Sequence, residues 1–325
     1  MADQDGRITL WGIEVFLAAA EEGAISAAAR RLAASPSAVS QQLSGLEAAL
    51  GTVLLDRSAR PMRITPAGAM FRKHAQIIVN AAAEARTELA VANMSGLTTL
   101  RLGMIEDFDA DVTPRLLTAL SSDLRGCRFL LETGASHRLL DQLDARALDI
   151  VVAADTGTEL AADADWIEVH PLLVEPFVVV APLGAVQPGQ DIATQLHALP
   201  LIQYTARHHM GRLISAHLAR QNLRLAQRFE LDSYSAILAM VAAGTGWTIL
   251  TPLAVQTVRP LHSKITVMPL PFAPLDRRIS LFARAGVLRD MPAQIATNLR
   301  DLLQTRVVTP SLAAMPWLKD TLRVL

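Results

Sequence analysis

Two short helical patterns joined by a tight turn constrain the fold of this chain more than any other feature. The first, Ile25 to Ala34, is rich in alanine, which favours helix and lets another helix approach closely. The second begins at Ser35-Pro36, because serine caps helix starts and proline fits the first helical position. Apolar residues then recur with helical spacing at Val39, Leu43 and Leu46. The pattern predicts a helix-turn-helix, whose second helix can lie in the major groove of DNA.

The second helix carries short, uncharged, hydrogen-bonding side chains on the side opposite its apolar stripe. Glutamine can pair with adenine through two hydrogen bonds, and serine can bond to several bases. The first helix adds a serine at its start and an arginine further along. We predict DNA contacts at Ser26, Arg30, Ser35, Pro36, Ser37, Ser40 and Gln41.

The residues around this unit are basic, although the whole chain is not. Residues 27–73 contain seven Lys or Arg and two acidic residues, a local net charge of +5, whereas the whole chain has a net charge of −1. This asymmetry suits phosphate contact by the first domain alone. Residues 57–63 look like the turn of a β-wing, with predicted contacts from Arg57, Arg60 and Arg63. Charge alone would equally allow a solvated basic loop, but the neighbouring helix pair favours DNA.

With these motifs the chain resembles the LysR-type transcriptional regulators, a large bacterial family with an N-terminal winged helix-turn-helix. The matching residues are Phe16, an alanine pair within 27–29, Ala38-Val39-Ser40, Leu46-Glu47, Leu50-Gly51, Leu54 to Arg57 and Thr65 to Gly68. Conservative departures from the family pattern occur at Ala24, Ile25, Leu55 and Ile64. Pro36 and Gln41 stand where Gln and Arg are common, so the family's DNA preferences carry over least at those two positions.

The resemblance covers nearly the whole chain and implies its organisation. It implies a winged helix-turn-helix over residues 7–65, a linker helix over 66–95, an α/β effector domain over 98–305 and a C-terminal extension over 306–325. The extension has no counterpart in the family, and we expect an added helix or a disordered end. The implied partners are double-stranded operator DNA, a small-molecule effector and RNA polymerase. The implied state is a cytoplasmic homodimer or homotetramer.

The linker segment carries its own pairing signal. Phe71, Ile78, Ala85 and Ala92 recur every seven residues, with other apolar residues near the second seam position. This repeat favours pairing between two copies of the helix, which would present two reading helices to one duplex. The alternative is an ordinary amphipathic helix packed on a core. In LysR-type regulators the linker helix dimerises.

From residue 98 onward, short strand patterns alternate with helical ones, which indicates a parallel α/β sheet. The resemblance implies the two-lobed, periplasmic-binding-protein-like (type 2) fold. Lobe 1 would comprise about 98–170 and 270–305, and lobe 2 about 171–269. The sequence predicts that strand 148–152 is followed by a strand at 177–181.

Polar residues follow several of these strands, where ligands bind in α/β sheets. The predicted effector-binding residues are Glu106, Asp107, Phe108, Ser136, Gln203, Tyr204, Arg207 and Thr245. Each has a purely structural alternative, such as helix capping for Asp107 and Ser136. Since Glu106 and Asp107 together would repel a carboxylate, we expect an effector that is polar, and neutral or amine-bearing at that end.

Other classes of protein fit the sequence less well. The single cysteine, Cys127, excludes an internal disulfide framework. The eight histidines have no metal-site spacing, and we expect no metal, no cofactor and no enzymatic activity. The acidic N-terminus is unlike a secretory signal, which argues against an exported solute-binding protein, and charges or prolines interrupt every apolar run that could span a membrane. One alternative remains: an effector-independent DNA-binding protein whose C-terminal half serves only oligomerisation.

Overall fold

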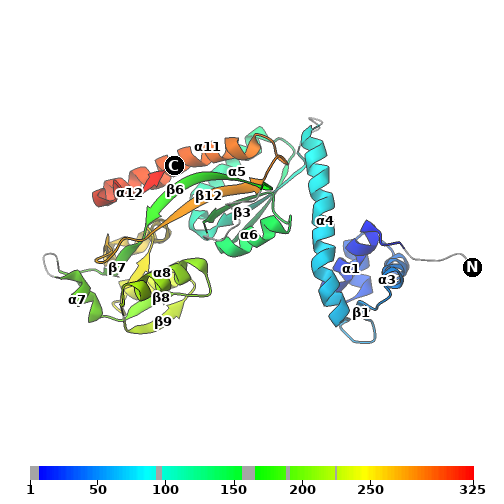
Figure 1. Cartoon of the computed structure of the whole chain (residues 1–325), viewed down its shortest axis with the longest axis horizontal. Coiled ribbons are helices and arrows are strands. Elements are labelled where there is room, and N and C mark those ends of the chain that lie inside the picture. The colour runs from blue at the N-terminus through cyan, green and yellow to red at the C-terminus, as the bar shows by residue number, and fades with distance from the viewer. Residues whose placement is uncertain (1–6, 93–96, 156–164, 188–190, 224) are drawn as a thin grey trace, which may run out of the picture. The chain divides into compact units, whose positions relative to one another are not determined.

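The computed structural model describes residues 7–92, 97–155, 165–187, 191–223 and 225–325 (Figure 1). The chain divides into two units. Unit 1 contains Met1–Ala90 together with Asp144–Ala147, and unit 2 contains Val91–Leu143 and Leu148–Leu325. Among the described residues, no helix is both long and apolar enough to cross a membrane.

Unit 1 is a helical bundle with a small two-stranded wing. Its elements are α1 (Leu10–Glu22), α2 (Ile25–Arg31), α3 (Pro36–Leu50), β1 (Leu55–Asp56), β2 (Arg63–Ile64) and α4 (Pro66–Ala92). The predicted cap is confirmed, because the Ser35 side chain accepts a hydrogen bond from the N–H of Ala38 at 3.2 Å. The first helix of the pair ends at Arg31, three residues before the predicted end, and Ala33 takes a left-handed φ of 51° in the turn. The predicted stripe of Val39, Leu43 and Leu46 is buried at 0–2% exposure.

Helix α4 begins on the core of unit 1 and continues beyond it. Phe71 packs against Phe16 with ring centroids 5.3 Å apart, and Ala75 is buried. Further along, Ile77, Ile78 and Leu89 are 44%, 42% and 62% exposed. Two positions of the predicted stripe, Ile78 and Ala85, are exposed to solvent.

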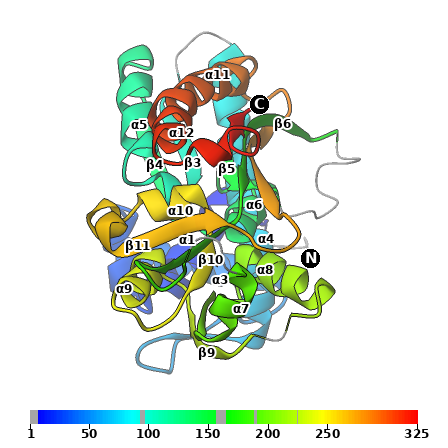
Figure 2. The same ribbon diagram turned by 90° about the vertical axis from the view of Figure 1, so that its left-hand side faces the viewer.

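The first lobe of unit 2 is built on a six-stranded sheet in the order β13-β6-β12-β5-β3-β4. Its strands are β3 (Thr99–Ile105), β4 (Arg128–Gly134), β5 (Ile150–Ala154), β6 (Ile167–Pro176), β12 (Asp276–Arg284) and β13 (Arg323–Val324). Helices α5 (Val112–Asp123) and α11 (Met291–Leu303) pack against each other on one side of the sheet, and α6 (Ser136–Asp144) lies on the other side (Figures 1 and 2).

The sheet differs from the prediction in two respects. Only β4, β3 and β5 run parallel, whereas β12 is antiparallel to β5 and β6 because it returns from the second lobe and enters the sheet from the opposite end. Strand β6 was not predicted, because Pro171, Glu175 and Pro176 interrupt its apolar residues and prolines disfavour central strands. The register between β6 and β12 shifts next to Pro171 and so accommodates it.

The second lobe holds a sheet of β10 (Thr248–Leu250), β7 (Val178–Pro182) and β11 (Ile265–Pro269), in that order and antiparallel. The parallel pair β8 (Leu201–Tyr204) and β9 (Gln227–Leu231) continues it through a bridge between Leu201 and Trp247. The lobe's helices are α7 (Ile192–His197), α8 (His209–Arg220), α9 (Tyr234–Ala242) and α10 (Pro252–Gln256). Trp247 is among the largest fully buried side chains and belongs to this lobe's core.

The C-terminal segment extends the first lobe. A π-helical turn at Gln304–Val308 follows α11, and α12 (Thr309–Ala314) follows the turn. Strand β13 then pairs with β6. The added helix expected from the sequence is present, and the strand after it was not predicted.

Candidate functional site

Helix α2, the start and exposed face of α3, and the wing carry the predicted DNA-contacting residues. Ser26, Arg30, Ser35, Pro36, Ser37, Gln41, Arg57, Arg60 and Arg63 are exposed or partly exposed, and Ser40 is half-buried. Ser35 and Ser37 hydrogen-bond to each other at 3.0 Å through their hydroxyls. Arg30, Arg60 and Arg63 form no ion pair within the described part of the chain. Their guanidinium groups are therefore open to an external anion such as a phosphate.

Arg57 has a structural partner that the sequence reasoning missed. Its guanidinium donates to Glu47 Oε2 at 2.6 Å and to the Ser44 hydroxyl at 3.1 Å, both on α3. The other oxygen of Glu47 accepts the backbone N–H groups of Leu54 and Leu55 at 2.8 and 3.2 Å. Glu47 thus fixes the start of the wing against α3, and Arg57 is held by the same carboxylate. Leu46-Glu47 and Arg57 belong to separate sequence motifs, and their spacing does not indicate the ion pair between Glu47 and Arg57.

The second candidate site is the cleft between the two lobes of unit 2. Glu106 and Asp107 follow β3, Ser136 begins α6, and Tyr204 ends β8 on the opposite lobe. These four predicted residues line one small cavity of about 30 Å³. The Tyr204 hydroxyl closes it by donating to Glu106 Oε1 at 3.3 Å, and it also contacts His208 Nδ1 at 2.9 Å. The cavity has room for little more than a water molecule.

The other four predicted effector residues do not line this cavity. Phe108 is fully buried in the hydrophobic core. Gln203 is buried, and its side chain donates to the Ser215 hydroxyl at 2.6 Å. Arg207 is exposed and lies 3.8 Å from Asp232. Thr245 sits in the turn between α9 and β10, where its N–H bonds to the carbonyl of Met240.

A buried ionic cluster lies against the same cavity and was not predicted. Arg277 of β12 donates to Asp107 Oδ1 at 2.7 Å and through Nε to Glu175 Oε1 at 2.7 Å. Arg277 Nη2 also donates a hydrogen bond to the Thr251 hydroxyl at 3.2 Å. The second oxygen of Glu175 accepts the N–H of Leu253 at 3.2 Å. The cluster therefore ties residues from both lobes together.

The ionisable groups of the cleft are shifted by burial and by one another. Partial desolvation, followed by the charge of Asp107, raises the pKa of Glu106, which lies at the exposed rim. Burial raises the pKa of Tyr204 and lowers the pKa of His208 and His209, which favours neutral histidines. Burial also raises the pKa of Glu175, whereas the charge of Arg277, which Glu175 shares with Asp107, lowers it. Among the described residues, no cluster of His, Cys, Asp or Glu could hold a metal ion.

Sequence and structure comparisons cover both units. Residues 10–69 match the family described as "Bacterial regulatory helix-turn-helix protein, lysR family", and residues 96–306 match "LysR substrate binding domain". A Mycobacterium avium protein named "Probable hydrogen peroxide-inducible genes activator" is 32% identical over 295 residues, which cover 89% of this chain and 92% of the relative. A full-length OxyR variant from Pseudomonas aeruginosa shares the fold with a TM-score of 0.65 and 24% identity, covering 91% of this chain and 95% of that one. Vibrio fischeri DarR, solved in complex with DNA, has a TM-score of 0.52 and 19% identity, covering 91% and 99%.

Proposed function

Because the chain belongs to the LysR family of DNA-binding transcriptional regulators, whose C-terminal domain senses an effector, we propose that the cleft between its lobes is the effector site. The effector would contact Glu106, Ser136 and Tyr204, which the sequence predicted, together with His208 and His209. DNA would be bound by the exposed face of α3 and by Arg60 and Arg63 of the wing.

The hydrogen bond between Tyr204 and Glu106 carries this proposal. It joins the two lobes across a cavity of about 30 Å³, so that an effector larger than water would break it and part the lobes on entering this cavity. Binding is then coupled to a change in the arrangement of the lobes, as an effector needs if it is to alter a distant function. By thermodynamic linkage, the effector and DNA change each other's affinity by the same factor.

The charges in the cleft narrow the chemistry of the effector. The expectation that Glu106 and Asp107 would act together has to be corrected, because Asp107 is paired with the buried Arg277. Glu106 remains as the carboxylate at the rim, beside neutral histidines and two tyrosine hydroxyls. We infer a small polar effector that is uncharged or bears an amine near Glu106, and that donates hydrogen bonds to this carboxylate.

The name of the Mycobacterium avium relative raises a second candidate, a response to hydrogen peroxide. This chain has a single cysteine, Cys127, so it cannot form a disulfide within itself. The thiol is half-buried just before β4, and burial together with the charge of Asp149 raises its pKa. A raised pKa lowers the fraction of reactive thiolate. The residues of this chain therefore favour a bound effector over a thiol-based sensor.

The remaining partners follow from the family and from α4. The open apolar residues Ile77, Ile78 and Leu89 support a homodimer or homotetramer assembled through this helix. Contact with RNA polymerase at the promoter and a cytoplasmic location belong to the same proposal. The relatives are regulators, and we assign the chain no enzymatic activity.

Thermal unfolding of the purified protein with a panel of metabolites tests the effector site. The panel contains amino acids, polyamines, sugars and aromatic and dicarboxylic acids, and a ligand of the folded state raises the midpoint. A compound that binds in the cleft should lose affinity in Tyr204→Phe and Ser136→Ala and keep it in Arg220→Gln, a control on the exposed face of α8. If a compound stabilises the protein and its affinity is unchanged in both cleft variants, it binds outside the cleft. If no compound raises the unfolding midpoint, the result would favour the alternative in which the C-terminal half serves only oligomerisation.

A further inference from the structure

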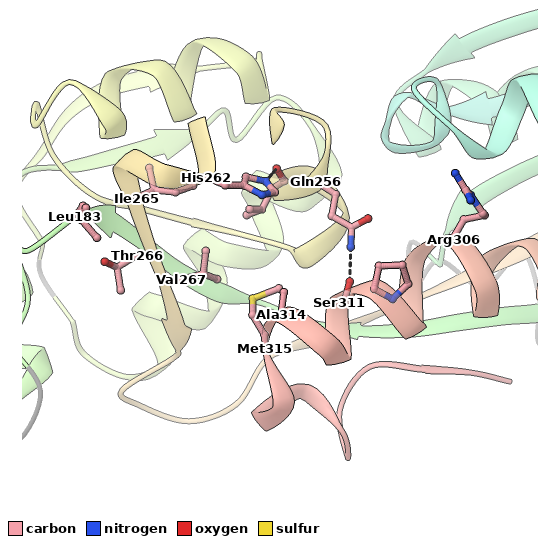
Figure 3. A pocket seen from close by; sticks show the side chains of 12 residues that line it. Leu183, Gln256, His262, Ile265, Thr266, Val267, Arg306, Ser311, Ala314 and Met315 are labelled. Atoms are coloured by element: carbon pink, nitrogen blue, oxygen red, sulfur yellow. Dashed lines mark hydrogen bonds between the residues drawn. The ribbon is translucent and has the colours of Figure 1, made fainter. Parts of the chain in front are cut away.

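A second cavity, far larger than the one in the cleft, lies between the second lobe and the C-terminal segment. It encloses about 760 Å³ and is lined by β11, α10 and the loop after β7 on one side, and by α12 with its flanking residues on the other (Figure 3). No residue lines both this cavity and the cleft cavity. The extension that the sequence left without a role therefore forms one wall of a separate cavity.

The walls of this cavity are mostly apolar. Its apolar lining is contributed by Leu183, Val255, Ile265, Val267, Pro310, Ala314 and Met315. The described residues of the lining include no Asp or Glu, and His262 is already bonded to the carbonyl of Val255 at 3.0 Å. Volumes of about 300–1,000 Å³ with apolar walls and a few polar groups are typical of small-molecule sites.

Three polar lining residues, Arg306, Gln256 and Ser311, lie toward one end of the cavity, whereas Thr266 lies near Leu183 at the other end. Figure 3 shows Arg306 at the opposite end of the lining from Leu183, with the hydrogen bond from the Gln256 amide to the Ser311 hydroxyl between them. Arg306 donates through Nε to Asp111 Oδ2 at 3.2 Å, and Asp111 also accepts from Arg115 at 2.6 Å. Two guanidinium groups thus share one carboxylate, which leaves this end positively charged. The Arg306 side chain is 40% exposed, so part of it is accessible to a ligand.

We propose that this cavity binds an amphipathic carboxylate, a molecule with an apolar body and one acidic group. The carboxylate is held by Arg306 beside Gln256 and Ser311, and the apolar body lies along Val267, Ala314 and Met315. Charge-assisted hydrogen bonds from a guanidinium select a carboxylate over a neutral group of the same size. The site is separate from the proposed effector cleft, where a carboxylate would meet Glu106.

Because of the position of the cavity, a bound molecule could affect how the two lobes are arranged relative to each other. One wall belongs to the second lobe, whereas α12 continues from α11, which packs on the first lobe's sheet. A smaller neighbouring cavity of about 390 Å³ shares Gln256 and Arg306 and reaches Asp107 of the buried ionic cluster. A ligand in the larger cavity would therefore hold the C-terminal segment and the second lobe in one arrangement.

Calorimetric titration of the full-length protein with decanoate, and separately with decanol, tests this proposal. Decanoate should bind saturably, with one molecule per chain. Arg306→Gln should weaken decanoate about tenfold or more and leave decanol unchanged, since only decanoate uses the positive charge. Ala314→Phe and Val267→Phe each place an aromatic ring in the cavity, from α12 and from β11, and each should weaken binding of both compounds. Arg220→Gln, which removes an exposed charge on α8, should change nothing.

Three results would overturn the proposal. These are the absence of saturable decanoate binding at millimolar concentration, decanoate binding that neither cavity-filling variant weakens, and an equal effect of Arg306→Gln on decanoate and decanol. Circular dichroism and the unfolding midpoint establish that each variant is folded, and the two filling variants lie on different elements so that one can replace the other. Because binding is measured directly, failure here leaves the proposal for the effector cleft untouched.

Discussion

Arg277 and Asp107 form a buried ion pair, 2.7 Å from Nη2 to Oδ1, although 170 residues separate them in the chain. Neither side chain is more than 6% exposed, and Glu175 shares the same guanidinium. One cation thus holds two buried carboxylates beside the cleft. The stability of unit 2 should depend far more on the arginine than on either acid.

Arg277→Met should therefore be strongly destabilising. It leaves two buried carboxylates without their cation, and breaking a buried pair in this way costs about 3–5 kcal/mol. Asp107→Asn should cost much less, because Glu175 can balance the arginine. Urea unfolding followed by circular dichroism measures both, with Arg207→Met as a control at an exposed pair worth at most about 1 kcal/mol. Equal losses from Arg277→Met and Arg207→Met would contradict this account of the cluster.

Glu106 should make stability depend on pH in a defined direction. Its folded-state pKa lies above the ordinary value of 4.5, so the folded form holds this proton more tightly than the unfolded form. The contribution to stability is full below pH 4.5 and is lost as the pH rises through the folded-state pKa. Glu106→Gln, which stays neutral, should gain stability relative to the wild type as the pH rises to neutrality. The gain should be small, because Glu106 is partly exposed.

Glu230→Gln provides a control of opposite sign. Hydrogen bonds from the Thr205 hydroxyl and the Ala206 N–H lower the pKa of Glu230, so its contribution is present above the ordinary pKa and is lost in acid. This variant should lose stability relative to the wild type as the pH rises. Unfolding free energies measured from acid, below the folded-state pKa of Glu230, up to neutral pH give both trends, and the same trend in both variants would refute the assignment.

On the DNA-contacting surface, Gln41 and Arg63 should have different effects. Gln41→Ala should relax base preference at one position, with a loss of about 1–3 kcal/mol there if the amide makes a bidentate contact. Arg63→Gln should weaken binding to all sequences and reduce the dependence of affinity on salt by about one phosphate contact. Binding to a library of operator variants at several salt concentrations separates the two effects. If Gln41→Ala weakened binding to all sequences and Arg63→Gln changed base preference, Arg63 would be the base-reading residue and Gln41 the general contact.

The apolar residues along α4 should support assembly. Replacing both Ile78 and Leu89 with Lys should weaken self-association about a hundredfold or more, since each buried aliphatic side chain contributes about 1.5–3 kcal/mol. Val53→Lys, an equally exposed apolar site outside α4, should have no such effect. Sedimentation velocity measures the distribution of species. An unchanged distribution in the double variant would show that these residues do not mediate assembly.

Local signals in the sequence predicted the local structure well. Ser35, Pro36 and the stripe at Val39, Leu43 and Leu46 specify helix α3 through capping and periodicity, which depend on neighbours a few residues away. The same reasoning located most strands and helices of unit 2. It could also group Glu106, Asp107, Ser136 and Tyr204, because strand ends meet at one edge of a sheet.

Contacts between distant segments could not be predicted in this way. Arg277 contacts Asp107 and Glu175 only because β6 and β12 are paired. The prolines of β6 interrupt its apolar pattern, so periodicity does not predict that strand. The large cavity likewise needs α12 to lie across from β11, and neither segment carries a motif that signals the other. The ion pair between Arg57 and Glu47 likewise could not be predicted, although the two residues are closer in the sequence.

An effector in the cleft should alter how the protein binds DNA, and this coupling is the central claim. We would test it by footprinting the purified protein on the DNA upstream of its own gene, with and without each compound of the metabolite panel. We predict a protected site with dyad symmetry whose extent changes with one compound, and no such change in Tyr204→Phe at the same concentration. Protection that no compound alters, or a change that persists undiminished in Tyr204→Phe, would contradict the claim.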